Sequence, residues 1–137
     1  MSYHALAEVL GIDEPLDDPG LIEITRRGLP SHALDTLAGQ LGVTENEMSR
    51  FLHVSHHTLV RNRGKILDKH LSDHLISVGK VFARCVELFR STDYGSRWLK
   101  SPLLALGNVR PLDLLDATTG VTMVMNVLGR IEQGVYS

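Results

Sequence analysis

The sequence predicts an all-α fold. Apolar residues recur three and four positions apart in several segments, which is the spacing of one buried helix face. No segment shows sustained alternation of apolar and polar residues between hairpin turns, the pattern of β-strands. The 137 residues, 43% of them hydrophobic and 22% charged, have the composition of one globular domain.

Two broad classes of protein are excluded by residue usage. The single cysteine, Cys85, can form neither an internal disulfide nor a CxxC metal site. No apolar window has the length of a membrane span, and no basic segment precedes an apolar stretch at the start of the sequence. We therefore expect a cytoplasmic protein.

Residues 1–29 form the acidic part of the chain. The first 25 residues contain six Asp or Glu and no Lys or Arg. Prolines and glycines divide this segment into short apolar stretches. It predicts an acidic N-terminal arm with one or two short helices.

Residues 30–70 predict three short helices. Ser31 is suited to cap the first helix, which carries leucines at 34, 37 and 41 and ends at Gly42. Residues 44–47, Thr-Glu-Asn-Glu, form a capping box at the start of the second helix. Ser55 is suited to cap the third, over 56–63.

Two short helices joined by a three-residue turn are the arrangement of a DNA-reading helix-turn-helix. Residues 50–69 carry five Lys or Arg against one acid, which also favours an anionic partner. The alternatives are an ordinary solvated helix face and a helical hairpin without a DNA function. The residues expected to contact DNA are Ser55, His56, His57, Thr58, Arg61, Asn62, Arg63 and Lys65.

Residues 71–137 predict a long helix followed by shorter ones. From Ser72 onward, an apolar seam at heptad spacing includes Phe82 and ends at Phe89, so it fits either a second chain or an internal core. Pro111 is suited to the first turn of a short helix, and a last helix is expected over 119–132.

No catalytic, cofactor or metal site emerges from the sequence. It contains no nucleophile elbow, Walker loop or dinucleotide-binding glycine pattern. His70 and His74 have the spacing of a chelating pair, but without a third ligand nearby we interpret them as surface histidines. Cys85 falls in the apolar seam and is interpreted as a core residue.

The segment LAGQLGVTENEMSRFLHVSHHTLVRNR resembles the helix-turn-helix of the Xre (phage-repressor-like) family, with His53 where such turns commonly have glycine. From Trp98 onward the chain looks like the toxin-binding domain of the Xre/MbcA/ParS antitoxin family. The matching residues are Trp98, Leu99, Pro102, Ala105, Leu106, Gly107, the run 111–116, Gly120, the run 128–132 and the run 134–137.

This resemblance implies a type II antitoxin, a helical dimer that binds its operon DNA and neutralises a toxin. The usual partner in this family is a RES-domain toxin, an enzyme that consumes NAD or transfers ADP-ribose from it. The implied fold is an Xre-like helix-turn-helix bundle followed by a small helical toxin-binding domain. Residues 71–137 are expected to serve both dimerisation and toxin binding, with the sharpest family match at 98–137.

Family members block the active-site entrance of the toxin with their C-terminal region. The sequence here offers a glycine hinge, an apolar anchor, a phenolic donor and flanking charges. The expected toxin-binding residues are Arg130, Glu132, Gly134, Val135, Tyr136 and Ser137. The alternatives are a frayed tail and, for the whole chain, a stand-alone Xre-type repressor without a toxin partner.

Overall fold

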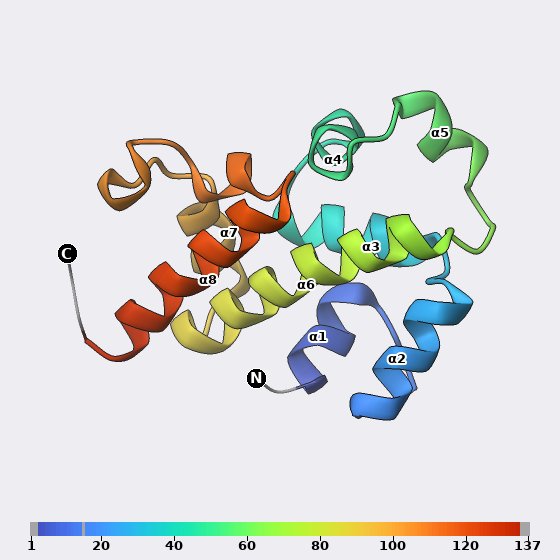
Figure 1. Cartoon of the computed structure of the whole chain (residues 1–137), viewed down its shortest axis with the longest axis horizontal. Coiled ribbons are helices and arrows are strands. Elements are labelled where there is room, and N and C mark those ends of the chain that lie inside the picture. The colour runs from blue at the N-terminus through green and yellow to red at the C-terminus, as the bar shows by residue number, and fades with distance from the viewer. Residues whose placement is uncertain (1–2, 15, 135–137) are drawn as a thin grey trace.

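The computed structural model describes residues 3–14 and 16–134. Within them the chain forms α-helices and short 3-10 turns and no β-strand, which confirms the all-α prediction. None of these helices is long and apolar enough to cross a membrane. The elements are α1 (Tyr3–Leu10), α2 (Asp18–Arg27), α3 (His32–Leu41), α4 (Glu45–Leu52), α5 (His56–Arg61), α6 (Lys69–Phe89), α7 (Thr92–Leu99), η1 (Leu104–Leu106), η2 (Pro111–Leu114) and α8 (Thr118–Glu132) (Figure 1).

Helix α6 runs through the middle of the molecule, and the other long helices pack around it (Figure 1). The seam residues Leu75, Val78, Phe82 and Cys85 are completely buried within the single chain. Burying each such side chain contributes about 1.5–3 kcal/mol to folding. These four seam residues therefore belong to the internal core, whereas Phe89, at the end of the seam, is half-buried.

The acidic N-terminal segment contains two helices, α1 and α2, and both lie against α6. The side chains of Leu6 and Leu10 on α1 are completely buried there. Gly79 on α6 permits this close packing, since a Cβ at that position would lie 3.1 Å from a methyl group of Leu10.

The helix caps largely follow the sequence. The capping box of α4 is present: the Glu47 backbone N–H donates to Oγ1 of Thr44 at 3.2 Å, and the Thr44 N–H donates to the Glu47 carboxylate at 3.3 Å. Ser31 departs from the expectation, because its side chain does not cap α3. Its Oγ accepts a hydrogen bond from the N–H of Gly64 at 2.8 Å and so holds the loop before α6.

The C-terminal elements fold back onto α6. Pro111 opens the 3-10 turn η2 instead of an α-helix, and α8 begins at Thr118, one residue earlier than expected. Gly120 lets α8 touch η2, because a Cβ on it would lie 1.8 Å from the carbonyl oxygen of Leu114. Trp98 is half-buried and packs against Phe89, with ring centroids 5.6 Å apart.

Candidate DNA-binding and partner-binding surfaces

The turn between α4 and α5 has the geometry that the sequence predicts. His53 ends α4 in the left-handed conformation, with φ of 54°. Ser55 then caps α5 by accepting a hydrogen bond from the N–H of Thr58 at 3.0 Å. Leu59 anchors α5 to the core, with 4% of its surface exposed. The predicted two-helix motif is therefore formed.

Helix α5 is shorter than expected and ends at Arg61 instead of residue 63. The side-chain amide of Asn62 donates to the carbonyl of Thr58 at 2.8 Å, and Gly64 follows with φ of 74°. A side chain that bonds to the backbone in this way competes with helix continuation. Arg63 and Lys65 therefore lie in the loop after α5.

Three of the expected DNA-contacting residues are hydrogen-bonded within the motif. The hydroxyl groups of Ser55 and Thr58 lie 2.8 Å apart, and Asn62 is held by the backbone of Thr58. Thr58 and Asn62 are half-buried. These side chains shape α5, and less of their hydrogen-bonding capacity remains for a base edge.

An acidic residue that the sequence did not single out lies among the basic ones. Glu45, in the first turn of α4, forms an ion pair with Arg63, with 2.6 Å between its Oε2 and the guanidinium. The same oxygen lies 3.5 Å from Nε2 of His56. Its position eighteen residues before Arg63 gave no local signal of this contact. Glu45 compensates part of the positive charge next to α5.

Three other residues expected to contact DNA face solvent. His57, Arg61 and Lys65 are exposed, and none has an ion pair or side-chain hydrogen bond within the part of the chain that the structure describes. Phosphate contacts from such side chains supply most of the affinity of non-specific DNA binding. Of the eight expected residues, Arg61, Arg63 and Lys65 offer the positive charge.

The end of α8 holds the expected toxin-binding residues that the structure describes. Glu132 forms an ion pair with Arg84 of α6, which fixes the last turn of α8 to the core. Arg130 is exposed, and Gly134 has φ of 75°, a conformation that turns the chain away from the helix axis. Residues 135–137, which include Val135, Tyr136 and Ser137, lie outside the described residues. Figure 1 shows α5 and the end of α8 at opposite ends of the molecule.

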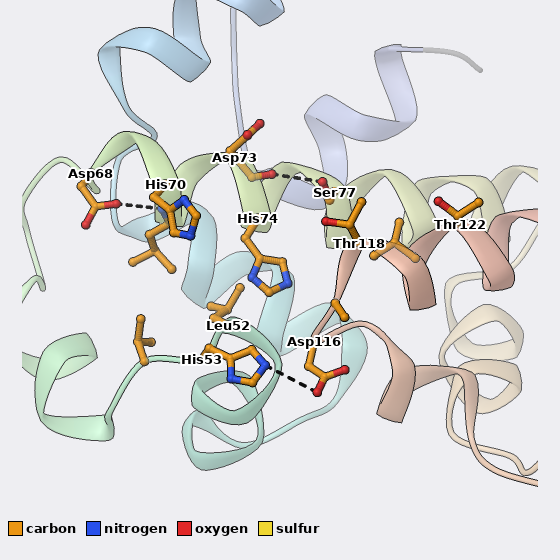
Figure 2. A pocket seen from close by; sticks show the side chains of 14 residues that line it. Leu52, His53, Asp68, His70, Asp73, His74, Ser77, Asp116, Thr118 and Thr122 are labelled. Atoms are coloured by element: carbon orange, nitrogen blue, oxygen red, sulfur yellow. Dashed lines mark hydrogen bonds and ion pairs between the residues drawn. The ribbon is translucent and has the colours of Figure 1, made fainter.

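A cleft of about 380 Å³ lies where the helix-turn-helix meets the start of α8 (Figure 2). His53 and Asp116 face each other across it at 3.5 Å, and the His74 ring donates from Nε2 to the carbonyl of Leu115 at 2.8 Å. His70 also lines the cleft. Among residues 3–14 and 16–134, no group of three His, Cys, Asp or Glu side chains is placed to hold a metal ion.

The surroundings of Asp113 and Cys85 shift the pKa values of these two side chains. The guanidinium of Arg110 binds both carboxylate oxygens of Asp113, at 3.0 and 2.7 Å, and this lowers the pKa of Asp113. Burial raises the pKa of the Cys85 thiol to about 12. A thiol of that pKa carries no thiolate near neutral pH, so Cys85 is a core residue, as the sequence predicts.

Two family models match the chain in order. Residues 20–78 match the antitoxin Xre-like helix-turn-helix domain, and residues 85–134 match the antitoxin Xre/MbcA/ParS C-terminal toxin-binding domain. The first match includes α2 and the first part of α6. The second match ends at Gly134.

Curated relatives cover most of the chain. An Antitoxin Xre of Photorhabdus laumondii is 29% identical over 123 residues, which is 87% of this chain and 82% of the relative. A Prs ADP-ribosylating antitoxin of a Sphingobium species is 25% identical over 134 residues, 90% of this chain and 82% of the relative. An Antitoxin Xre of Yersinia enterocolitica is 26% identical over 122 residues, 85% of this chain and 81% of the relative.

Proposed function

Because the chain belongs to the Xre-type antitoxins of type II systems, we propose that it neutralises a RES-domain toxin and represses its own operon as a cytoplasmic homodimer. The observation that carries this proposal is the ordered match of both domains in one chain. The relatives are antitoxins and not enzymes, so the chemistry belongs to the toxin. That toxin consumes NAD or transfers ADP-ribose from it.

The C-terminal region is the part that blocks the toxin. The ion pair between Arg84 and Glu132 joins the last turn of α8 to α6, and Gly134 follows in the left-handed conformation. Arg130 is exposed near this point and has no partner in the described ranges. A positive group near the C-terminus suits the rim of a cleft that binds an anionic dinucleotide. We place Val135, Tyr136 and Ser137 in that cleft.

A stand-alone repressor is the alternative, and the match to the toxin-binding domain argues against it. The geometry supports two separate activities, because α5 and the end of α8 lie at opposite ends of the molecule (Figure 1). One copy can therefore hold DNA and toxin at once. DNA binding rests on the exposed cations Arg61 and Lys65 together with Arg63, with the exposed His57 beside them.

The decisive experiment isolates the tagged chain from its own host with neighbouring genes intact, identifies any protein bound to it, and measures NAD loss. We expect a stoichiometric complex that consumes no NAD. When the complex is dissociated, the freed toxin should consume NAD. Deleting residues 134–137 should restore NAD consumption more than it weakens the complex. Full neutralisation by the shortened chain would remove the tail from the mechanism. Absence of any complex would contradict the antitoxin role itself.

Two exposed arginines provide a reciprocal control for the DNA role. Arg61→Ala should weaken binding to a duplex from the operon promoter and reduce its salt dependence by about one ion, and it should leave toxin inhibition unchanged. Arg130→Ala should weaken toxin inhibition and leave DNA binding unchanged. Fluorescence anisotropy over a salt series measures the first effect. Equal effects of both variants on both assays would contradict the separation of the two surfaces.

A further inference from the structure

We propose that two copies of this chain pair through the exposed face of α2, antiparallel about a two-fold axis at Ile22. The inference deepens the proposed function, since it rests on a dimer and names the surface that forms it. The heptad seam of α6 is already filled by the chain's own helices. A dimer therefore needs another face, and α2 belongs to the helix-turn-helix domain match.

Ile22 is an exposed apolar residue on the outer face of α2. Its side chain is 52% exposed in the middle of the helix. It borders a shallow hollow between α2 and α6, which Ile76 and Lys80 also line. A helix ridge beside a groove is the shape that a second identical helix can pack into.

The charges along α2 are complementary to themselves. Asp18 lies four residues before Ile22 and Arg26 four residues after it, so all three share one stripe of the helix. When two such helices pack antiparallel with Ile22 at the centre, Asp18 of each copy meets Arg26 of the other. A two-fold interface requires this kind of self-complementary patch.

The charged groups of this stripe are available for such contacts. Arg26 is exposed and has no ion pair or hydrogen bond among the residues that the structure describes, whereas its neighbour Arg27 is paired with Glu14 at 3.0 Å. The Tyr3 hydroxyl hydrogen-bonds to one oxygen of Asp18 and so holds that exposed carboxylate in place. The α6 border of the hollow carries Lys69, Asp73 and Lys80, so its balance of charge is positive and suits Glu23 of a second copy.

The other exposed large apolar residues of the described chain lack this pattern. On α8, Met123 is 43% exposed, but the residues four positions away are Thr119 and Val127. Leu104 is the most exposed, at 88%, but it lies in a 3-10 turn that offers no helical face of matched charges. The combination of an apolar centre with opposite charges on both sides therefore singles out α2.

Pairing through α2 leaves the DNA-binding helix free. Figure 1 shows α2 and α5 on opposite sides of α3 and α6. A two-fold dimer formed at α2 thus presents two copies of α5 to solvent. Two such helices can read paired half-sites on DNA.

The test uses the full-length chain and sedimentation equilibrium. We expect the wild type to dimerise and Ile22→Glu to weaken dimerisation by about tenfold or more, because two like charges would meet at the axis. Met123→Glu is the matched control, since it adds the same charge at an exposed apolar site of α8 and should leave dimerisation unchanged. Arg26→Glu should weaken the dimer as well.

A cross-linking variant tests the position of the axis independently. Ile22→Cys should form a disulfide-linked dimer under mild oxidation, because the two positions face each other. The native Cys85 is buried and does not compete, and Met123→Cys should stay uncross-linked. A monomeric wild type, a dimer unaffected by Ile22→Glu, or a dimer that Ile22→Cys fails to link would each overturn the proposal.

Toxin inhibition separates this inference from the proposed function. The Ile22→Glu chain should still inhibit the toxin, because its α8 is unchanged. Retained inhibition with unchanged dimerisation would refute the α2 interface alone. Lost inhibition by a wild-type dimer would refute the antitoxin proposal alone.

Discussion

Glu45 and Arg63 are joined by an ion pair of 2.6 Å that links the first turn of α4 to the loop after α5. Because Glu45 also lies 3.5 Å from His56, one carboxylate faces two of the residues expected to contact DNA. An acid in this position lowers the positive potential of the surface. The pair therefore connects the geometry of the helix-turn-helix to its affinity for phosphate.

We predict that Glu45→Gln tightens binding to the operon duplex. The change frees Arg63 and removes one negative charge beside α5, so affinity should rise several-fold and the salt dependence should steepen by about one ion. Fluorescence anisotropy over a series of salt concentrations measures both. Asp35→Asn is the matched control, because it removes the same charge from an exposed site on α3 without releasing an arginine. An equal increase in DNA affinity in the two variants would show that the effect comes from net charge alone and not from the release of Arg63.

The left-handed turn at His53 gives a second prediction. A residue with a Cβ is disfavoured at φ of 54°, whereas glycine is not. We expect His53→Gly to raise the free energy of unfolding by about 0.5–1 kcal/mol and His53→Ala to lower it by a similar amount. Urea denaturation gives both values.

Asp116→Asn serves as the control for His53, because it removes the contact across the cleft without altering the turn. Both side chains of that contact are well exposed, so its loss should change stability little. If Asp116→Asn destabilised the protein as much as His53→Ala, the contact and not the turn would be the source of the effect.

Burial of Cys85 predicts a dependence of stability on alkaline pH. Since the folded pKa is raised from 9.0 to about 12, the native state keeps a proton that the unfolded chain loses above pH 9. The stability contribution is full below pH 9 and declines as pH rises toward 12. Between pH 8 and pH 10.5 the wild type should therefore lose about 2 kcal/mol more than Cys85→Ala, since each pH unit above 9 is worth about 1.4 kcal/mol. Parallel urea titrations at pH 8 and at pH 10.5 measure it, and equal losses in both proteins would contradict the shift.

The caps and turns of the helix-turn-helix could be predicted because they depend on neighbours in sequence. The Thr44 capping box and the Ser55 cap follow from patterns within four residues, whereas the turn position of His53 was indicated by the family resemblance. Contacts over longer separations could not be predicted in this way. Ser31 bonds to Gly64 and Glu45 to Arg63, and nothing in either segment indicates its partner.

The burial of α6 was also beyond the sequence pattern. A heptad seam looks the same whether its own chain or a second chain covers it, and here the chain's own helices cover Leu75 and Phe82. The candidate toxin-binding site was predictable only through the family resemblance, because the residues at the end of α8 are ordinary charges and glycines. Its proposed blocking segment, 135–137, lies outside the described residues.

Two glycines of α8 provide the last prediction, because they belong to the same helix and have different surroundings. A Cβ at Gly120 would lie 1.8 Å from the Leu114 carbonyl oxygen, a backbone atom that cannot move without displacing η2, whereas a Cβ at Gly129 would meet nothing within 4 Å. We expect Gly120→Ala to lower the free energy of unfolding by about 2 kcal/mol or more, since the substitution overpacks a rigid contact. Gly129→Ala should raise it by up to about 1 kcal/mol, because alanine is the better helix former. Thermal and urea unfolding measure the stability of the two variants. A Gly120→Ala protein as stable as the wild type would show that α8 does not pack on η2 in this way.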